Sequence, residues 1–286
     1  MESSIPASGT NDARRRFWRR FFRTPLAAIS SAWVVAVAAA CIFYPAVTHQ
    51  TGLITDVAHS YASPSSGHIL GTDGLGRDEF VRVLIGGRVS LLVGFVAAIV
   101  AMFIGTCVGA IAGFYGAFVD ALLMRMVDVF LAVPTLFLLL FLAAMFHGNV
   151  ATLIVVIGAT SWLGPSRLVR GDVLTIKERL YVEAARSLGA ADARVLWRHI
   201  IPNAAGTIVT TTTFMVANAM LAETALSYLG IGVRAPTPSW GNLLSSAQSD
   251  VFAGAYWLIV PPGLAILLTV TALNFIGDWL RENAAR

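Results

Sequence analysis

Charged side chains are scarce in this sequence. Only 13% of its 286 residues are Asp, Glu, Lys or Arg, whereas 57% are hydrophobic. Soluble globular domains contain about 25% charged and about 45–50% apolar residues. The imbalance excludes an ordinary water-soluble domain, because a single aqueous core cannot bury so much apolar surface. The length fits one membrane domain and leaves little room for a second globular one.

Lysine, cysteine and histidine are scarce as well. Lys177 is the only lysine and follows Ile176, so the GxxxxGK[ST] phosphate-binding loop of an ATPase is missing from the sequence. Cys41 and Cys107 both lie inside apolar runs, which does not support a disulfide framework. The five histidines have no HExxH or other paired-ligand spacing, so we expect neither a metal site nor a cofactor on this chain.

Long apolar runs are abundant. A bilayer core of about 30 Å is crossed by roughly 20 helical residues, and six runs approach or exceed that length. They are Leu26–Val47, Val89–Val119, Val129–Phe146, Gly148–Ser166, Ile200–Ala222 and Val251–Gly277. We therefore predict an all-α integral membrane protein of about six transmembrane helices, with residues 1–25 as a basic N-terminal segment and 26–286 as one transmembrane domain.

The arginines predict the orientation. With the N-terminus inside, 16 of the 20 basic residues fall on the inner side, and the other four are Arg77, Arg82, Arg88 and Arg234. Inner segments are enriched in Lys and Arg, so both termini are predicted to be cytoplasmic. Because the charges lie in the gaps between apolar runs, the net charge of +4 does not indicate nucleic-acid binding. Arg14–Arg23, with aromatics interleaved, fits either an amphipathic segment on the inner leaflet or a simple topology signal, and residues 1–13 are expected to be disordered.

Two polar stretches interrupt the apolar pattern, one outside at about 48–88 and one inside at about 167–202. Within the inner stretch, Tyr181–Leu188 is rich in helix-forming residues, and Gly189 is suited to end that helix. Asp192 is a candidate N-cap for a second helix over 193–201, and Pro202 marks the entry to the next span. From the residues alone, this loop fits either an interfacial hairpin or a surface that transmits force into the neighbouring spans.

The same loop resembles the EAA motif of ABC importer permeases. The matching residues are Glu183, Ala184 and Ala185, then Gly189 after three residues, and Ile201-Pro202 at the position of a hydrophobic-proline pair. The sequence departs from the motif at His199 and Ile201, which replace isoleucine and leucine. The resemblance implies that the first helix is a coupling helix in a cleft of an ATPase subunit, with Glu183, Ala184, Ala185, Gly189 and Pro202 as its coupling residues.

Further segments resemble the C-type subunit of dipeptide, oligopeptide, nickel and glutathione permeases. They are Gly71–Asp78, Asp120–Asp128, Leu168–Gly171, Ala222–Ser227 and Pro236–Asn242. The resemblance implies a type I ABC importer permease in a bacterial inner membrane. Its partners would be a second homologous permease subunit, ABC ATPase subunits that hold ATP and Mg²⁺, and an extracytoplasmic substrate-binding protein. Dipeptides are the expected cargo, while longer peptides, nickel and glutathione remain alternatives.

The remaining outer residues leave several interpretations open. Glu223 ends the fifth apolar run near the outer interface, where it serves either a structural hydrogen-bonding role at an outer gate or substrate binding. The stretch around Pro236 cannot be a continuous helix; we expect it to cover the outer mouth, with Trp240 anchored at the interface. Asp73, Arg77 and Asp78 either contact a docked binding protein or hold a glycine-rich turn together.

Two other classes of membrane protein are weighed against this interpretation. A stand-alone channel or ion-driven carrier often has several ionisable groups at mid-membrane depth, and the apolar runs contain none there. An intramembrane enzyme would need paired acids, a Ser/His pair or a metal cluster within the spans. The second run also carries Gly105, Gly109 and Gly113, which predict close helix packing, and Pro134 predicts a bend in the third.

Overall fold

The protein is mainly helical, and its computed structural model describes residues 20–21, 23–146, 149–252 and 254–284. In chain order the elements are α2 (Pro25–Thr48), η1 (Val57–His59), α3 (Glu79–Tyr115), α4 (Ala117–Leu131), α5 (Thr135–Met145), α6 (Val150–Ser161), α7 (Leu163–Ile176), α8 (Leu180–Ser187), α9 (Asp192–Val195), η2 (Leu196–Ile200), η3 (Ile201–Ala204), α10 (Ala205–Tyr228), α11 (Trp240–Val251), η4 (Tyr256–Leu258) and α12 (Val260–Ala284). The expectations for residues 1–13, and for most of Arg14–Arg23, fall outside these ranges.

The number of membrane-crossing segments agrees with the sequence. Four segments, which contain α2, α3, α10 and α12, are each long and apolar enough to cross a bilayer. Two bent pairs pass the same test together, α4 with α5 at 82° and α6 with α7 at 44°. Counting each pair as one span gives six, the number predicted from the apolar runs.

Proline and helix-end residues produce the breaks in these pairs. The chain turns at 132–134, where Pro134 precedes the first residue of α5 and cannot continue the hydrogen bonding of α4. The third apolar run therefore covers only the end of α4 and all of α5, so its predicted bounds were too short. The bend between α6 and α7 falls at Trp162, inside the fourth run.

Several other predicted bounds were wrong at the polar ends of the helices. Helix α3 begins at Glu79, because Asp78 caps it by accepting a hydrogen bond from the backbone N–H of Val81 at 3.1 Å. The last ten residues of the outer stretch assigned to 48–88 are thus helical. Likewise, α7 includes the first ten residues of the inner stretch assigned to 167–202. The sixth run started too early, since α12 begins only at Val260.

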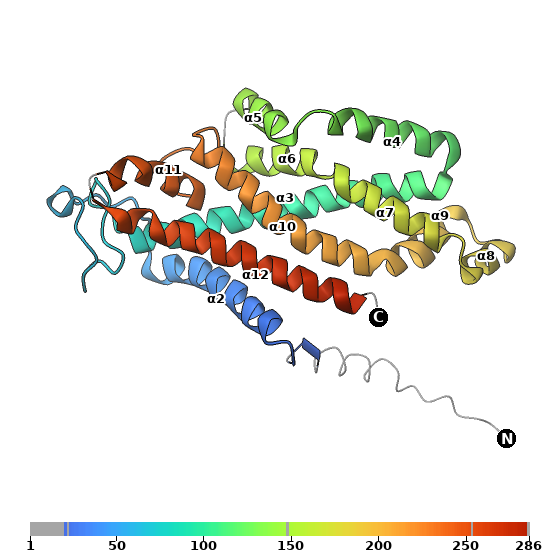
Figure 1. Ribbon diagram of the computed structural model, residues 1–286, viewed down its shortest axis with the longest axis horizontal. Coiled ribbons are helices and arrows are strands. Elements are labelled where there is room, and N and C mark those ends of the chain that lie inside the picture. Colours follow the sequence, from blue (N-terminus) through green and yellow to red (C-terminus); the bar gives the residue numbers. More distant parts are fainter. Residues whose placement is uncertain (1–19, 22, 147–148, 253, 285–286) are drawn as a thin grey trace, which may run out of the picture.

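Helix α3 forms the centre of the bundle and packs against α2, α6, α7 and α10 (Figure 1). Its glycines allow the close approach that the sequence predicts. A β-carbon at Gly105 would lie 2.8 Å from Cβ of Pro165, and one at Gly113 would lie 2.9 Å from the carbonyl oxygen of Arg170. The backbones of α3 and α7 therefore touch along the glycine stripe.

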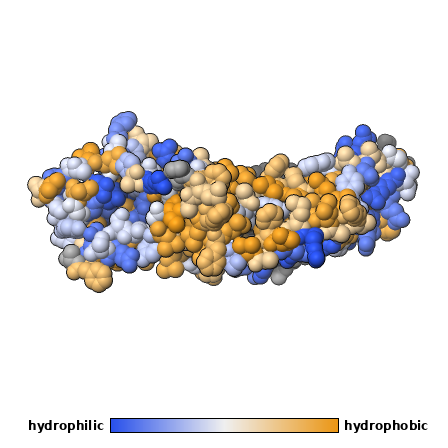
Figure 2. All heavy atoms as spheres, turned by 90° about the horizontal axis from the view of Figure 1, so that it is seen from above, coloured by the Kyte–Doolittle hydropathy of each residue, from blue (hydrophilic) through white to orange (hydrophobic). Residues whose placement is uncertain are grey.

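The elongated bundle has two different ends (Figure 1). We call them the α11 end, where α11 lies beside the segment before α3, and the α8 end, where α8 and α9 lie. Helix α2 begins and α12 finishes toward the α8 end. Figure 2 shows hydrophobic side chains gathered over the middle of the face in view and more hydrophilic ones at both ends. This distribution matches a molecule with an apolar belt between two aqueous faces.

Candidate functional site

Helix α8 ends in a Schellman motif. Gly189 has a φ of +80°, the left-handed conformation that glycine adopts without strain. Its N–H donates to the carbonyl of Arg186 at 2.9 Å, and the N–H of Ala190 donates to the carbonyl of Ala185 at 3.1 Å. These two bonds are the pair that defines this motif. The turn after α8 is thus specified by one glycine, as the sequence predicts.

Only one side chain anchors α8 by burial. Val182 is fully buried in the cluster that also contains Val195 and Ile200. In contrast, Leu188 is 88% exposed, and Glu183 and Ala184 also face outward. Glu183 and Ala184 therefore lie on a surface that the other described residues leave open.

Two further contacts tie α8 and its approach to the end of α3. The guanidinium of Arg186 lies 4.8 Å from the ring centroid of Phe114, which is a cation–π distance. Lys177 Nζ donates to the carbonyl of Gly113 at 2.9 Å. Lys177 lies in the short segment between α7 and α8. Both contacts therefore hold α8 and this segment against the end of α3.

The second helix of the loop differs from the prediction. Asp192 is the first residue of α9 rather than its cap; Ala191 occupies the N-cap position without a side-chain bond. The helix then continues into α10 through a π-helical turn at η2 and a 3-10 turn at η3. Pro202 lies in η3, and because it has no N–H to donate, the irregular turns accommodate it without ending the helix. It is exposed.

A cavity of about 910 Å³ lies between α10, the α4–α5 bend and the α6–α7 pair. Hydroxyl and amide side chains account for much of its lining: Thr135, Thr160, Ser161, Asn203, Thr207, Thr210, Thr211 and Asn218. A cavity lined by such groups forms hydrogen bonds with a polar ligand without selecting the side chains of that ligand. This feature was missed in the sequence, although the signal was present, since Thr207, Thr211 and Asn218 recur at helical spacing on one face of α10.

Ion pairs join α4 to α7 beside this cavity. Arg170 forms a bidentate pair with Asp120, and Arg167, which lines the cavity, pairs with Asp128. The first pair is part-buried and the second half-exposed. Both ion pairs hold α4 against α7, the helix that leads to α8.

Glu223 is fully buried where α3 meets α10. Its carboxylate accepts hydrogen bonds from Ser90 Oγ at 2.8 Å and from Ser227 Oγ at 2.6 Å. Ser90 Oγ in turn accepts from the N–H of Trp240 at 3.2 Å, and Ser227 Oγ accepts from the N–H of Val233 at 3.0 Å. The acid thus joins α3 to α10 and, through the two serines, to Val233 and to the first residue of α11, which is the arrangement a structural role requires.

Sequence comparisons place this geometry in a known family. Residues 105–286 match the family described as binding-protein-dependent transport system inner membrane component, and residues 13–64 match the N-terminal TM domain of oligopeptide transport permease C. The glutathione transport system permease protein GsiD of Pectobacterium atrosepticum is 37% identical over 286 residues, covering 99% of this chain and 95% of the relative. The oligopeptide transport system permease protein OppC of Bacillus subtilis is 37% identical over 263 residues, covering 92% and 86%.

The chain belongs to the binding-protein-dependent ABC transport permeases. It is a multi-pass inner-membrane permease subunit of an ABC importer. Such a permease works with an ATPase and a substrate-binding protein.

The 229–239 segment of the permease packs over the start of α3, but Trp240 is not an interface anchor. That expectation was wrong, because Trp240 is only 1% exposed and its Nε1 donates to the carbonyl of Val83 at 2.9 Å. A buried tryptophan needs such a partner. Pro236 lies just upstream, after a cis peptide bond to Ala235. Ser239 and Asn242 form a capping box that starts α11.

The three charged residues of the turn before α3 of the permease, Asp73, Arg77 and Asp78, are engaged within the chain. Asp73 accepts hydrogen bonds from the backbone N–H groups of Leu75 and Arg77, both at 2.9 Å, and from Arg77 Nε at 2.7 Å. Asp78, besides capping α3, lies 2.8 Å from His68 Nδ1. These bonds hold the glycine-rich turn together, and Arg77 and Asp78 also keep part of their surface exposed.

The loop before this turn of the permease carries two perturbed ionisable groups. A hydrogen bond between His59 Nδ1 and Asp56 Oδ2, at 2.7 Å, lowers the pKa of the Asp56 carboxyl. Tyr61 Oη donates to Asp250 Oδ1 at 2.8 Å, and this bond raises the pKa of the Tyr61 phenol. The second bond links the loop to α11.

Proposed function

We propose that this permease carries short peptides, dipeptides foremost, as one half of a channel completed by a second homologous permease subunit. Helix α8 is its coupling helix, with Glu183, Ala184, Ala185, Gly189 and Pro202 as the coupling residues. The α8 end and both termini face the cytoplasm, as the arginine distribution favours. ATP and Mg²⁺ reside on the partner ATPase, and a binding protein delivers cargo at the α11 end.

The connection between the cavity and α8 carries this proposal. Helix α7 lines the cavity at 163–165, 167 and 168, and only three residues separate its last residue from α8. A displacement of α8 therefore reaches the cavity wall through one continuous segment. The ion pairs of Arg167 and Arg170 extend the same displacement to α4. This is the mechanical link that alternating access needs: ATP-driven closure of the ATPase dimer moves α8, and the cavity opens toward the binding protein.

Co-purification tests the coupling role. We expect Glu183→Ala and Gly189→Ala to reduce recovery of the ATPase with the permease about tenfold or more. Glu178→Ala is the matched control, since Glu178 is an exposed acid of the same loop just before α8. Full recovery of the ATPase with both α8 variants would show that α8 is not the contact.

Uptake measurements test the cargo. The complete transporter in proteoliposomes, with ATP enclosed in the lumen and the binding protein outside, is expected to accumulate radiolabelled dialanine. Tripeptides should compete with this uptake. Glutathione is the second candidate, because two of the similar permeases, from Pectobacterium atrosepticum and Escherichia coli O157:H7, are named for it at 37% and 38% identity. Uptake of glutathione or a nickel chelate without uptake of any peptide would overturn the peptide assignment.

A further inference from the structure

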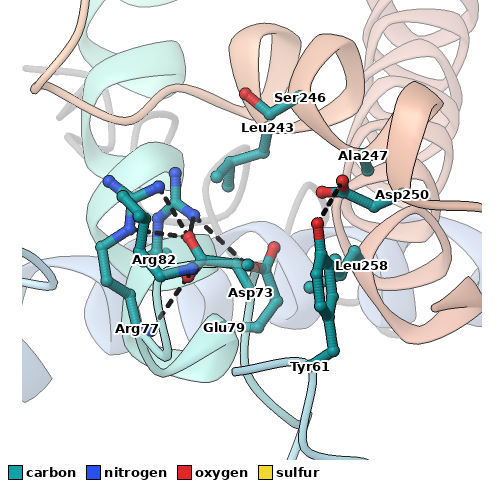
Figure 3. Close-up of a pocket in the computed structure, with 12 residues that line it drawn as sticks. Tyr61, Asp73, Arg77, Glu79, Arg82, Leu243, Ser246, Ala247, Asp250 and Leu258 are labelled. Carbon is teal, nitrogen blue, oxygen red and sulfur yellow. Dashed lines mark hydrogen bonds and ion pairs between the residues drawn. The ribbon is translucent and has the colours of Figure 1, made fainter. Parts of the chain in front are cut away.

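A second cavity, of about 310 Å³, lies at the α11 end and is separate from the large one (Figure 3). Its walls come from the segment before α3, the first turn of α3, α11 and η4. The charged residues of the lining are Asp73, Arg77, Glu79, Arg82 and Asp250. Three carboxylates therefore face two guanidiniums, which leaves one formal negative charge in the lining.

The two arginines are already occupied. Arg77 and Arg82 both pair with Asp73, which also accepts two backbone N–H groups. Figure 3 shows the two guanidiniums converging on this carboxylate at one side of the cavity. Asp73 and the two arginines together carry one formal positive charge, and Glu79 and Asp250 carry two formal negative charges on the rest of the lining.

Glu79 is a buried residue whose carboxylate is ion-paired with Arg82 but forms no hydrogen bond with the described residues. Its side chain is only 2% exposed, and its nearest cation is Arg82 Nη1 at 3.9 Å, beyond hydrogen-bond distance. Buried carboxylates in folded proteins are hydrogen-bonded in the great majority of cases. Since Glu79 lines the cavity, its free acceptors are open to a ligand there.

Asp250 supplies a second acceptor from the opposite wall. It accepts one strong hydrogen bond, from Tyr61 Oη at 2.8 Å, and retains further lone pairs. It also lies in the last turn of α11, where the carbonyl groups carry the negative end of the helix dipole. The position therefore favours a positive charge.

We propose that this cavity binds a primary ammonium group, which donates hydrogen bonds to Glu79 and Asp250. An ammonium is a compact cation with three donors, so it can bridge acceptors on facing walls. A metal ion is a poorer match, because the described residues contain no cluster of three or more His, Cys, Asp or Glu side chains placed to hold one. The ammonium comes either from a small ligand, such as the amino terminus of a peptide, or from a lysine of the docked binding protein.

Binding of a simple amine tests the site without any transport assay. In saturation-transfer NMR on the assembled, detergent-solubilised transporter, n-butylammonium is expected to bind saturably and n-butanol is not. Glu79→Gln and Asp250→Asn should each weaken butylammonium binding at least tenfold. Asp56→Asn, which removes the same charge from an exposed acid of the neighbouring loop outside the cavity, should leave it unchanged.

Two results would overturn the site: equal binding of butanol, or butylammonium binding that both cavity variants retain. Because the measurement requires no cargo, it fails or succeeds independently of the proposed peptide transport. If Glu79→Gln disrupts assembly, Asp250→Asn on the rim still decides the question.

A second measurement identifies the source of the ammonium. If a peptide amino terminus supplies it, Glu79→Gln removes the preference for free over N-acetylated dialanine in uptake and does not alter the half-saturating concentration of binding protein. If a lysine of the binding protein supplies it, that concentration rises and both peptides are affected equally. A third outcome is that Glu79→Gln abolishes butylammonium binding but alters neither the preference for free dialanine nor the half-saturating concentration of binding protein. That outcome would show that the ammonium site is not used in transport and would contradict both sources.

Discussion

The two ends of the bundle are built in opposite ways. At the α11 end, acids such as Glu223 and Asp73 are buried and accept hydrogen bonds from several donors each. The loop before α3, together with α3, α10 and α11, therefore forms one network. At the α8 end, the helix is anchored by the single buried side chain Val182 and exposes Leu188 almost entirely. The comparison suggests that the α11 end keeps its shape within the chain, while the α8 end obtains its final contacts from a partner.

This difference predicts that equivalent substitutions act on different properties. At the α11 end, loss of one side chain should lower the stability of the permease itself. At the α8 end, it should lower coupling with little change in stability. Each experiment below measures both properties, so that a variant that behaves like the opposite end would contradict the comparison.

The largest effect is expected for Glu223→Ala. It leaves the Ser90 and Ser227 hydroxyls without their acceptor in a dry site, which should cost about 3 kcal/mol or more. Thermal unfolding of the detergent-solubilised permease measures the loss, with Glu282→Ala as control because Glu282 is exposed. Glu223→Gln preserves the shape and should be milder. If Glu223→Gln assembled normally and yet abolished substrate-stimulated transport, the structural role would be wrong.

Asp73→Asn should come next, at about 2 kcal/mol, because it removes the charged acceptor of the buried Arg82. We expect faster proteolysis of the 49–78 segment and a lower melting temperature. Asp56→Asn is the matched control in the same segment, where the carboxyl is exposed. Equal proteolysis rates for the two variants would show that Asp73 does not hold the turn.

Gly189→Ala should cost only about 1 kcal/mol of stability, the usual penalty for a left-handed non-glycine residue. We expect ATPase activity stimulated by the binding protein to fall much more than stability, because α8 would end at a different angle. Gly171→Ala is a close control, since Gly171 is an exposed helical glycine with no heavy atom within 4 Å of a β-carbon. If both variants kept full stimulation, the Schellman turn would be irrelevant to coupling.

The features that could be predicted from the sequence depend on neighbouring residues or on the composition of a long segment. The apolar runs, the helix at 181–188 and the stop at Gly189 are of this kind. The bend at Pro134 was predicted and is confirmed, but the apolar runs revealed neither its size of 82° nor the 44° bend at Trp162 between α6 and α7. The apolar composition of a run also does not show at which residue a helix begins. The predicted first residues of α3 and α12 were therefore wrong.

Contacts between distant segments were the other failure. Trp240 was expected at a membrane interface, yet its partner is the carbonyl of Val83, more than 150 residues away. The buried Glu79 and the threonine face of α10 matter only once several helices surround them. The pattern at Thr207, Thr211 and Asn218 was visible as a periodicity, but its significance required the cavity.

The smallest effect tests the link between the loop before α3 and α11. The hydrogen bond to Asp250 raises the pKa of Tyr61 because the protonated phenol is the donor. Its stabilisation should be fully present below the ordinary tyrosine pKa of about 10 and be lost as pH rises through the higher folded value. Ultraviolet titration, with the Tyr61→Phe curve subtracted, isolates this phenol. Asp250→Asn should move the titration to lower pH, and an unchanged curve would show that the α11 end is not joined through this pair.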